Sequence, residues 1–234
     1  MVMKDYKVLS QLGLKARWAK QHDKVYSHIK DNHSNLKLEK ARLIGNIMGD
    51  GCITSIESHN RFPRHDIKFY PDDFNMANIF MKDFEKLYLK KPKIKDAENY
   101  YKVLVSSKPA WEDLINLTDF TSLNWKFPKK LLKSSEEKVE WLKAIFDCEG
   151  YVGKRRIQIQ SISKEGIFSI KKLLEELKIK SSICVYQRKN PLWNKNYILT
   201  IFGKERLLTF HNLIGFSHTK KQEKLKQIAG VPEW

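Results

Sequence analysis

The stretch that decides the fold is LIGNIMGDG, residues 43–51, which returns as LKAIFDCEG at residues 142–150. In both copies the apolar residues recur at helical spacing. Gly45 and Gly49 of the first copy lie four positions apart and therefore share a helix face, although a glycine inside a helix costs roughly 1 kcal/mol relative to alanine. Such a cost is tolerable where another backbone approaches closely. The repeat therefore predicts two motif helices packed against each other.

Each copy closes on an acid followed by glycine, Asp50–Gly51 and Glu149–Gly150. We expect each glycine to end its helix in a left-handed cap. A carboxylate at a helix C-terminus faces the negative end of the helix dipole, which is unfavourable by up to about 1 kcal/mol, and packing the helices adds repulsion between the two acids. A divalent cation with a preference for oxygen ligands, such as Mg²⁺, Ca²⁺ or Mn²⁺, would offset both effects.

An Asp-Gly pair after a single buried helix is most often an ordinary turn. Here the pattern occurs twice in one chain, and strand-like sequence follows each copy. The repetition favours a paired acidic site over two unrelated turns.

The charge of the chain points to a polyanionic partner. Its 234 residues include 44 Lys and Arg against 27 Asp and Glu, a net charge of +17. Because 41% of the residues are hydrophobic and 12% aromatic, this charge belongs to a folded surface and not to a disordered tail. The alternative on charge alone is a merely soluble basic protein.

Cysteine usage and hydropathy favour an intracellular protein of the cytoplasm or nucleoid. Cys52, Cys148 and Cys184 are odd in number and widely spaced, and no C-x-x-C pair indicates a zinc site or a disulfide framework. We found no apolar run of eighteen residues and no signal-peptide pattern.

The elements expected after the two motifs follow the same order. Each half reads as helix, two strands, helix, two strands, helix, with an alternating stretch in the second strand. We place the first half at residues 37–124 and the second, with a linker and a basic C-terminal helix, at residues 125–234. Residues 1–36 are expected to form an extension of short helices. The fold class is α+β, with two pseudo-symmetric αββαββα repeats built on antiparallel sheets.

Local signals support these boundaries. Ser134 and Glu137 have the spacing of a capping box at the start of the second motif helix. Asp72 or Asp73 can cap the helix that follows the first alternating strand, and Ser163 the corresponding helix of the second half.

The paired motifs resemble the LAGLIDADG motifs of homing endonucleases, specifically the single-chain, two-motif, archaeal intron-encoded type. The resemblance extends from about Leu38 onward. It implies motif helices packed at the centre, two sheets forming a DNA-binding saddle, and a monomer that acts as a pseudo-dimer. It further implies site-specific cutting of double-stranded DNA at a long asymmetric target, leaving 3′ overhangs.

The resemblance also implies the metal site. Asp50 and Glu149 correspond to the metal-binding carboxylates, each helping to cut one strand, and the carbonyls of Gly49 and Cys148 are expected as further ligands. Mg²⁺ is the expected cofactor. We expect Mn²⁺ to substitute for it and Ca²⁺ to support binding more than cleavage.

A basic residue in each half is a further family feature. Lys108 and Lys204, after the last strand of each half, are the lysines predicted to polarise water or to steady the transition state; the alternative for each is a surface lysine at a helix entry. Near the end of the second strand, Gln160 fits the residue type of the family. Tyr70 does not fit it, so a bias toward nicking one strand is a further expectation. Met48 stands where many relatives have an acid, but that position is not the metal ligand and does not count against the site.

The outward positions of the alternating strands supply candidate DNA contacts. Arg and Gln read purine edges, whereas Lys contacts phosphates and makes binding fall with salt. Such alternation alone is more often a plain solvated sheet face, but the charge and the paired acids favour DNA. The candidates are Lys68, Tyr70, Lys102, Lys154, Arg156, Gln158, Gln160, Arg188 and Lys195.

Two other function classes compete with the nuclease. An RNA-binding maturase, with intron RNA as its partner, would use the same basic sheets but would leave the carboxylates free to change. A DNA-binding regulator on a cleavage-impaired scaffold would have lost them. Both acids are retained, which favours the nuclease. We see no intein-splicing segment, and therefore expect a free-standing protein from an intron-type reading frame.

Overall fold

The computed structural model describes residues 2–58, 61–187, 190 and 192–231, and in them the expected order of elements occurs twice. The first half contains α2 (Lys37–Asp50), β1 (Gly51–Ser58), β2 (Arg61–Phe69), α3 (Phe74–Tyr88), β3 (Lys93–Asp96), β4 (Tyr101–Ser106) and α4 (Lys108–Ile115). The second half contains α5 (Ser135–Glu149), β5 (Gly150–Val152), β6 (Arg156–Ser161), α6 (Lys164–Glu176), β7 (Ser182–Tyr186), β8 (Asn196–Phe202) and α7 (Lys204–Leu213). The α+β class with two αββαββα repeats is confirmed.

The strand order of the two sheets is the same, which makes the halves pseudo-symmetric. The described residues form one sheet in the order β1-β2-β4-β3 and another in the order β5-β6-β8-β7, with every neighbouring pair antiparallel. In both halves the second strand buries one face, through Ile67 and Phe69 in β2 and through Ile157 and Ile159 in β6. The opposite face carries the polar residues of the alternating pattern.

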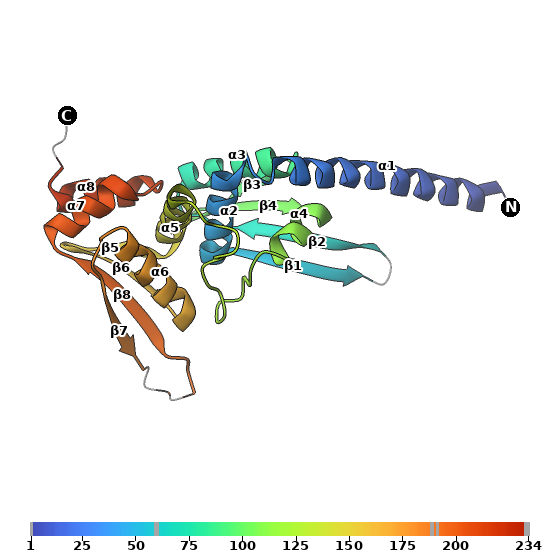
Figure 1. Ribbon diagram of the computed structural model, residues 1–234. Helices are drawn as coiled ribbons and strands as arrows, with labels where there is room; N and C mark the ends of the chain where they lie inside the picture. Colours follow the sequence, from blue (N-terminus) through green and yellow to red (C-terminus); the bar gives the residue numbers. More distant parts are fainter. Residues whose placement is uncertain (1, 59–60, 188–189, 191, 232–234) are drawn as a thin grey trace.

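The motif helices α2 and α5 pack side by side between the two sheets (Figure 1). Their glycines explain the close approach. A Cβ on Gly45 would lie 2.7 Å from Cβ of Ala144, and one on Gly49 would lie 2.3 Å from Cβ of Cys148. Arg42 adds an ion pair between the halves, because its guanidinium contacts Asp83 of α3 at 2.8 Å and Glu140 of α5 at 3.0 Å.

Gly51 and Gly150 correct one expectation. Neither adopts a left-handed cap, since φ is −115° at Gly51 and −75° at Gly150, both extended. What demands glycine at these positions is space. A Cβ on Gly51 would lie 2.5 Å from the Ile47 Cα, and one on Gly150 would lie 2.3 Å from the Phe146 carbonyl oxygen. The chain turns so sharply from helix into strand that the first strand residue touches the last helical turn.

The termini add one helix at each end. Residues 2–32 form a single helix, α1 (Val2–Asn32), where we expected several short ones, because the segment contains no proline and only one glycine, Gly13. It packs on α3 and α4 and extends away from the body (Figure 1). After α7, the basic helix α8 (Thr219–Ala229) packs on α7 and β5.

The helix caps fall where the sequence placed them. Asp73 caps α3, Ser163 caps α6, and Ser134 forms the capping box with Glu137 at the start of α5. The caps at Asp73 and Ser163 fix the start of the helices that follow each second strand, and so fix where β2 and β6 end.

Replacing Gly49 with alanine tests the close helix contact. Because the added Cβ would overlap Cβ of Cys148 on α5, we expect Gly49→Ala to lower the free energy of unfolding by about 3 kcal/mol. The matched control is Gly13→Ala, where nothing lies within 4 Å of the new Cβ and helix propensity improves. Urea melts of both variants measure the effect, and equal stabilities of Gly49→Ala and the parent would contradict the packing argument.

Candidate active site

Asp50 and Glu149 are the last residues of α2 and α5, so the packed helices end in two neighbouring carboxylates. Desolvation raises the pKa of Asp50, and the nearby Lys221 ammonium opposes this rise. Desolvation also raises the pKa of Glu149, as does the negative charge of Asp50, although the side chain of Glu149 keeps contact with solvent. The two acids are therefore close enough to repel each other.

The sheet register places Tyr70 and Gln160 beside these acids in equivalent positions. Gly51 pairs with Phe69 in one sheet and Gly150 with Ile159 in the other, so Tyr70 and Gln160 follow directly at the ends of their strands. The Tyr70 amide donates to the Asp50 carbonyl at 2.9 Å. Gln160 accepts at 3.3 Å through Oε1 from the side-chain amide of Asn196.

Lys108 lies away from the acids. It begins α4, and the neighbouring Ser107 amide donates to the His65 carbonyl. His65 lies four residues before Phe69 on β2, which puts Lys108 about 14 Å along the strand from the acidic end. Its ammonium contacts Glu112 at 3.6 Å.

Lys204 is placed in the same way in the second half. It follows the end of β8 that pairs with Arg156, four residues before Gln160 on β6. A Cβ on Gly230, beyond the end of α8, would lie 2.8 Å from the Lys204 Nζ, so this ammonium lies at the far end of α8. The structure brings neither Lys108 nor Lys204 to the acids. The last strand of each half, β4 or β8, runs antiparallel to β2 or β6, so it ends beside the start of that strand and away from its acidic end.

Lys221, and not Lys204, supplies the positive charge close to the two acids. From the first turn of α8, its Nζ donates to the Asp147 carbonyl at 2.5 Å and to the Cys148 carbonyl at 3.0 Å. These carbonyls immediately precede Glu149, and the positive charge lowers the pKa of both Asp50 and Glu149 against the effect of burial. The sequence showed only a basic C-terminal helix, with nothing to single out this lysine.

Asp147 is a second residue that sequence reasoning missed. Its side chain is 3% exposed, and one carboxylate oxygen accepts the backbone N–H groups of Ser217 at 2.8 Å and of His218 at 3.0 Å. Burial raises its pKa to about 6 against these hydrogen bonds. The sequence did contain a signal for Asp147, since this buried motif position holds an acid in the second motif and Met48 in the first.

The donor groups at the helix ends suit a hard divalent cation. Over the described part of the chain, no three His, Cys, Asp or Glu side chains gather to hold a metal, so a metal here would rely on two carboxylates and on backbone oxygens. Asp50 and Glu149 supply mutually repelling carboxylates, which a cation would relieve. The Cys148 carbonyl already accepts from Lys221 and has one further lone pair, so Gly49 and Cys148 differ as ligands.

The described candidate DNA contacts lie on strands and turns, and one candidate lies outside the described residues. Lys68, Lys102 and Gln158 are half-buried, and Gln158 donates to the Thr200 hydroxyl at 3.0 Å. Lys154, Arg156, Gln160 and Lys195 are exposed, and Tyr70 is half-buried. Arg188 falls among the residues that the structure does not describe.

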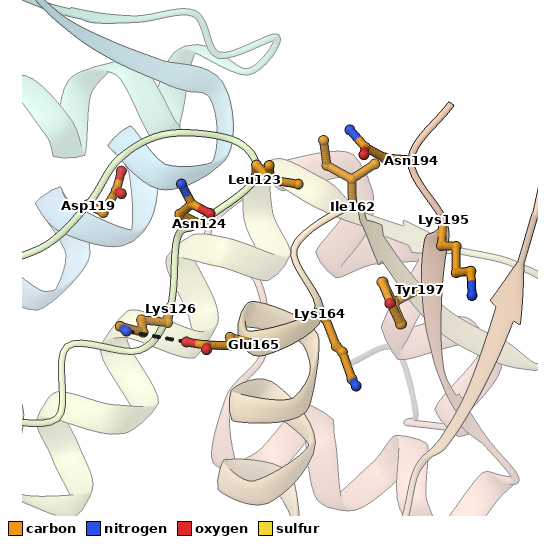
Figure 2. A pocket seen from close by; sticks show the side chains of 10 residues that line it. All are labelled: Asp119, Leu123, Asn124, Lys126, Ile162, Lys164, Glu165, Asn194, Lys195 and Tyr197. Carbon is orange, nitrogen blue, oxygen red and sulfur yellow. Dashed lines mark ion pairs between the residues drawn. The ribbon is translucent and has the colours of Figure 1, made fainter. Parts of the chain in front are cut away.

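A hollow of about 600 Å³ opens between the linker and the second half (Figure 2). Lys195 lines it from just before β8, Tyr197 from the start of β8, and Lys164 from the start of α6. On the linker side Lys126 pairs with Glu165 at 3.3 Å. Neither Asp50 nor Glu149 lines this hollow, so it is separate from the acidic site.

Comparison with known proteins identifies the fold. Residues 136–215 match the profile of the LAGLIDADG-like domain. The chain superposes on a structure of the homing endonuclease I-DmoI in complex with DNA and Mn with a TM-score of 0.62, at 19% identity, over 77% of this chain and 97% of that one. It also superposes on WhiA of Thermotoga maritima with a TM-score of 0.53, at 14% identity, over 90% of this chain and 67% of that one.

Two of the curated relatives are much longer proteins of one organism. The chain is 31% identical over 193 residues to a probable translation initiation factor IF-2 of Methanocaldococcus jannaschii, and 30% identical over 222 residues to the replication factor C small subunit of that organism. These matches cover 79% and 92% of this chain but only 15% and 11% of the relatives. The chain thus spans less than a fifth of the length of either protein.

The profile match and the superposition confirm the resemblance drawn from the sequence, and the fold is that of two-motif LAGLIDADG structures. Both motif helices lie on one polypeptide, and each is followed by its own sheet. Separately, none of the helices in the described ranges has the length and apolar character needed to span a membrane.

Proposed function

We propose that the protein is a site-specific, divalent-metal-dependent endonuclease that hydrolyses phosphodiester bonds in both strands of DNA. The observation that carries the proposal is the pair of carboxylates at the ends of α2 and α5, with the Lys221 ammonium beside them. I-DmoI, which shares the fold, has been crystallised with target DNA in the presence of Mn and of Mg, and with DNA and Ca. We take Mg²⁺ as the cofactor, with Mn²⁺ as a substitute.

The residues divide the work by their chemistry. Asp50 and Glu149, with the carbonyls of Gly49 and Cys148, hold the metal, which supplies Lewis-acid stabilisation of the phosphate and an activated water when bound. Lys221 places a fixed positive charge where negative charge builds up on the phosphate. Gln160 lies beside Glu149 and can orient water through its amide. We keep Lys108 and Lys204 only as remote phosphate contacts, because neither lies near the acids.

The two polar sheet faces supply the DNA contacts. Because the halves differ at nearly every outward position, the target is expected to be long and asymmetric. The ends left by cleavage are expected to be 3′ overhangs. The protein is expected to act inside the cell as a monomer, in which one chain supplies both halves.

Salt dependence tests the phosphate contacts. Each Lys–phosphate contact contributes about 0.9 to the slope of log affinity against log salt. We expect Lys195→Ala, in the hollow of Figure 2, to lower the slope by about that amount and to weaken binding to all sequences alike. Fluorescence anisotropy in Ca²⁺ measures both quantities. Lys30→Ala, an exposed lysine of α1, is the control, and an equal change of slope in the two variants would contradict the assignment.

A nicking or cleavage-impaired DNA-binding protein is the second candidate, and the asymmetry of the site favours it. Lys221 contacts the carbonyls of the second motif helix, whereas the first motif carries Met48 and is flanked by Tyr70. Incubation of a randomised DNA library with Mg²⁺, followed by sequencing of the ends, separates the candidates. Double-strand ends support the nuclease, single-strand breaks support nicking, and bound but intact DNA supports the binding protein. An intron maturase would instead give selective binding to structured RNA.

A further inference from the structure

The start of α8, residues 217–219, is attached to both halves of the protein. Backbone N–H groups at and just before the start of a helix have no intrahelical partners and need other acceptors. From the second half, Asp147 accepts those of Ser217 and His218. From the first half, Asp73 accepts that of Thr219 through Oδ2 at 3.1 Å. One helix N-terminus is thus held by carboxylates of two different halves.

Asp73 does this while capping its own helix. Its Oδ1 accepts the backbone N–H groups of Asn75 at 2.9 Å and Met76 at 3.2 Å, the usual cap of α3. The same carboxylate therefore caps α3 with one oxygen and α8 with the other. The corresponding cap of α6 is Ser163, whose single hydroxyl oxygen takes only the Gly166 amide at 3.1 Å and itself donates to the Trp125 carbonyl at 2.7 Å.

His218 and Asn75 complete the attachment. The ring of His218, 4% exposed, lies 3.2 Å from Asp72 and 3.7 Å from Asp73. Asn75 donates from its side chain to the Ser217 carbonyl at 2.8 Å. Residues 217–219 are therefore fixed in position by three side chains of the first half, Asp72, Asp73 and Asn75, and by Asp147 of the second.

Lys221 lies two residues beyond this attachment. Its backbone amide donates to Nδ1 of His218 at 3.4 Å, which is a further restraint. Its ammonium donates to the Asp147 and Cys148 carbonyls. Because the side chain of lysine is long and flexible, the place of its Nζ depends on where the helix begins. An unattached first turn would let the ammonium leave the end of α5.

We propose that Asp73 is a positioning residue that, together with Asp147, seats Lys221 at the acidic site, so that the centre at Glu149 depends on a residue of the other half. The proposal rests on the proposed function for its effect on cleavage. Its structural part, the attachment of α8 by Asp73, does not depend on that function.

The variant Asp73→Ser separates the two roles of this residue. Serine is a good helix cap, as Ser163 shows for α6, so the cap of α3 is kept. One short hydroxyl cannot also reach the Thr219 amide, so the attachment of α8 is lost. Asp31→Ser removes one exposed acid of α1 and is the control for the change in net charge.

Amide hydrogen exchange tests the attachment without any DNA. We expect the amides of Ser217, His218 and Thr219 to exchange about tenfold faster in Asp73→Ser, while those of Asn75 and Met76 change little. Asp31→Ser should leave all five as they are. Unchanged exchange at Thr219 would overturn the proposal even if the protein proves to be no nuclease.

A double-mutant cycle with Lys221→Met tests the consequence for cleavage. If Asp73 acts through Lys221, we expect Asp73→Ser to slow single-turnover cleavage about tenfold in the parent and to have little further effect in Lys221→Met. Affinity for DNA in Ca²⁺ should stay within about twofold of the parent, since the basic strands are untouched. Multiplicative losses in the cycle would show that Asp73 acts independently of Lys221 and would overturn the proposal. Absence of cleavage in the parent would instead reject the proposed function and leave the exchange result to decide.

Discussion

Asp50→Asn and Glu149→Gln are each expected to abolish double-strand cleavage while leaving DNA binding intact. Both substitutions keep the size of the side chain and remove only the charge that attracts the metal. We expect the rate of double-strand cleavage in Mg²⁺ to fall by about 10³-fold or more, because a lost metal ligand removes transition-state stabilisation that the basic strands cannot replace. Gel-based cleavage and anisotropy of the same variants measure the two properties separately.

The stability of these variants provides an independent check in the absence of metal. Since the folded-state pKa values of Asp50 and Glu149 are raised, the folded protein binds protons more tightly at these groups than the unfolded chain does. Their contribution to stability is present below the unfolded pKa and is lost as the pH rises through the folded pKa. At pH 7.5 in EDTA both ionised carboxylates therefore lower the stability of the folded protein, and each neutral variant should have a higher melting temperature than the parent.

The two variants are expected to lose cleavage and to gain thermal stability at the same time. A variant that loses cleavage and gains thermal stability behaves as the removal of a functional, destabilising charge. The margin in melting temperature should disappear below about pH 4, where the parent carboxyls are protonated. Cleavage at the parent rate by either variant would remove that acid from the mechanism, and lower stability in EDTA would show that the acids are structural.

Much of this fold could be predicted from the sequence because its signals are local. Helical glycine spacing, strand alternation and the caps at Asp73, Ser134 and Ser163 each act within a few residues, and duplication of the order exposed the two halves. The left-handed caps at Gly51 and Gly150 were wrong, because a glycine needed for close approach and a glycine needed for positive φ look the same in a sequence.

The basic partner of the acids could not be predicted, because it depends on a contact between remote segments. Lys204 has the expected place in the repeat, but β8 runs antiparallel to β6 and ends beside Arg156 at the start of β6, away from the acids. Lys221 comes from α8, which lies outside the repeated order, and reaches Cys148 only because Asp73 and Asp147 hold its helix. No periodicity or spacing in the chain reports an attachment of this kind.

Lys221→Met is expected to slow cleavage about 100-fold, the loss typical when one preorganised charge is removed from a developing anion. Methionine keeps most of the aliphatic stem and removes the ammonium that donates to the Asp147 and Cys148 carbonyls. Affinity for DNA in Ca²⁺ should change little, since a single positive charge near the cleavage point is a small part of a net charge of +17. Lys224→Met, an exposed lysine of the same helix, is the matched control.

The loss should fall unequally on the two strands. Within the described residues, Lys221 donates to the carbonyl before Glu149, and no side chain donates in the same way to the Gly49 carbonyl before Asp50. Cleavage at the Glu149 centre should therefore slow more than cleavage at the Asp50 centre, and nicked DNA should accumulate in Lys221→Met. End-labelling each strand of the target separately measures the two rates. Equal slowing of both strands would mean that the ammonium serves the shared charge of Asp50 and Glu149, and an unchanged rate on both would exclude Lys221 from the chemistry.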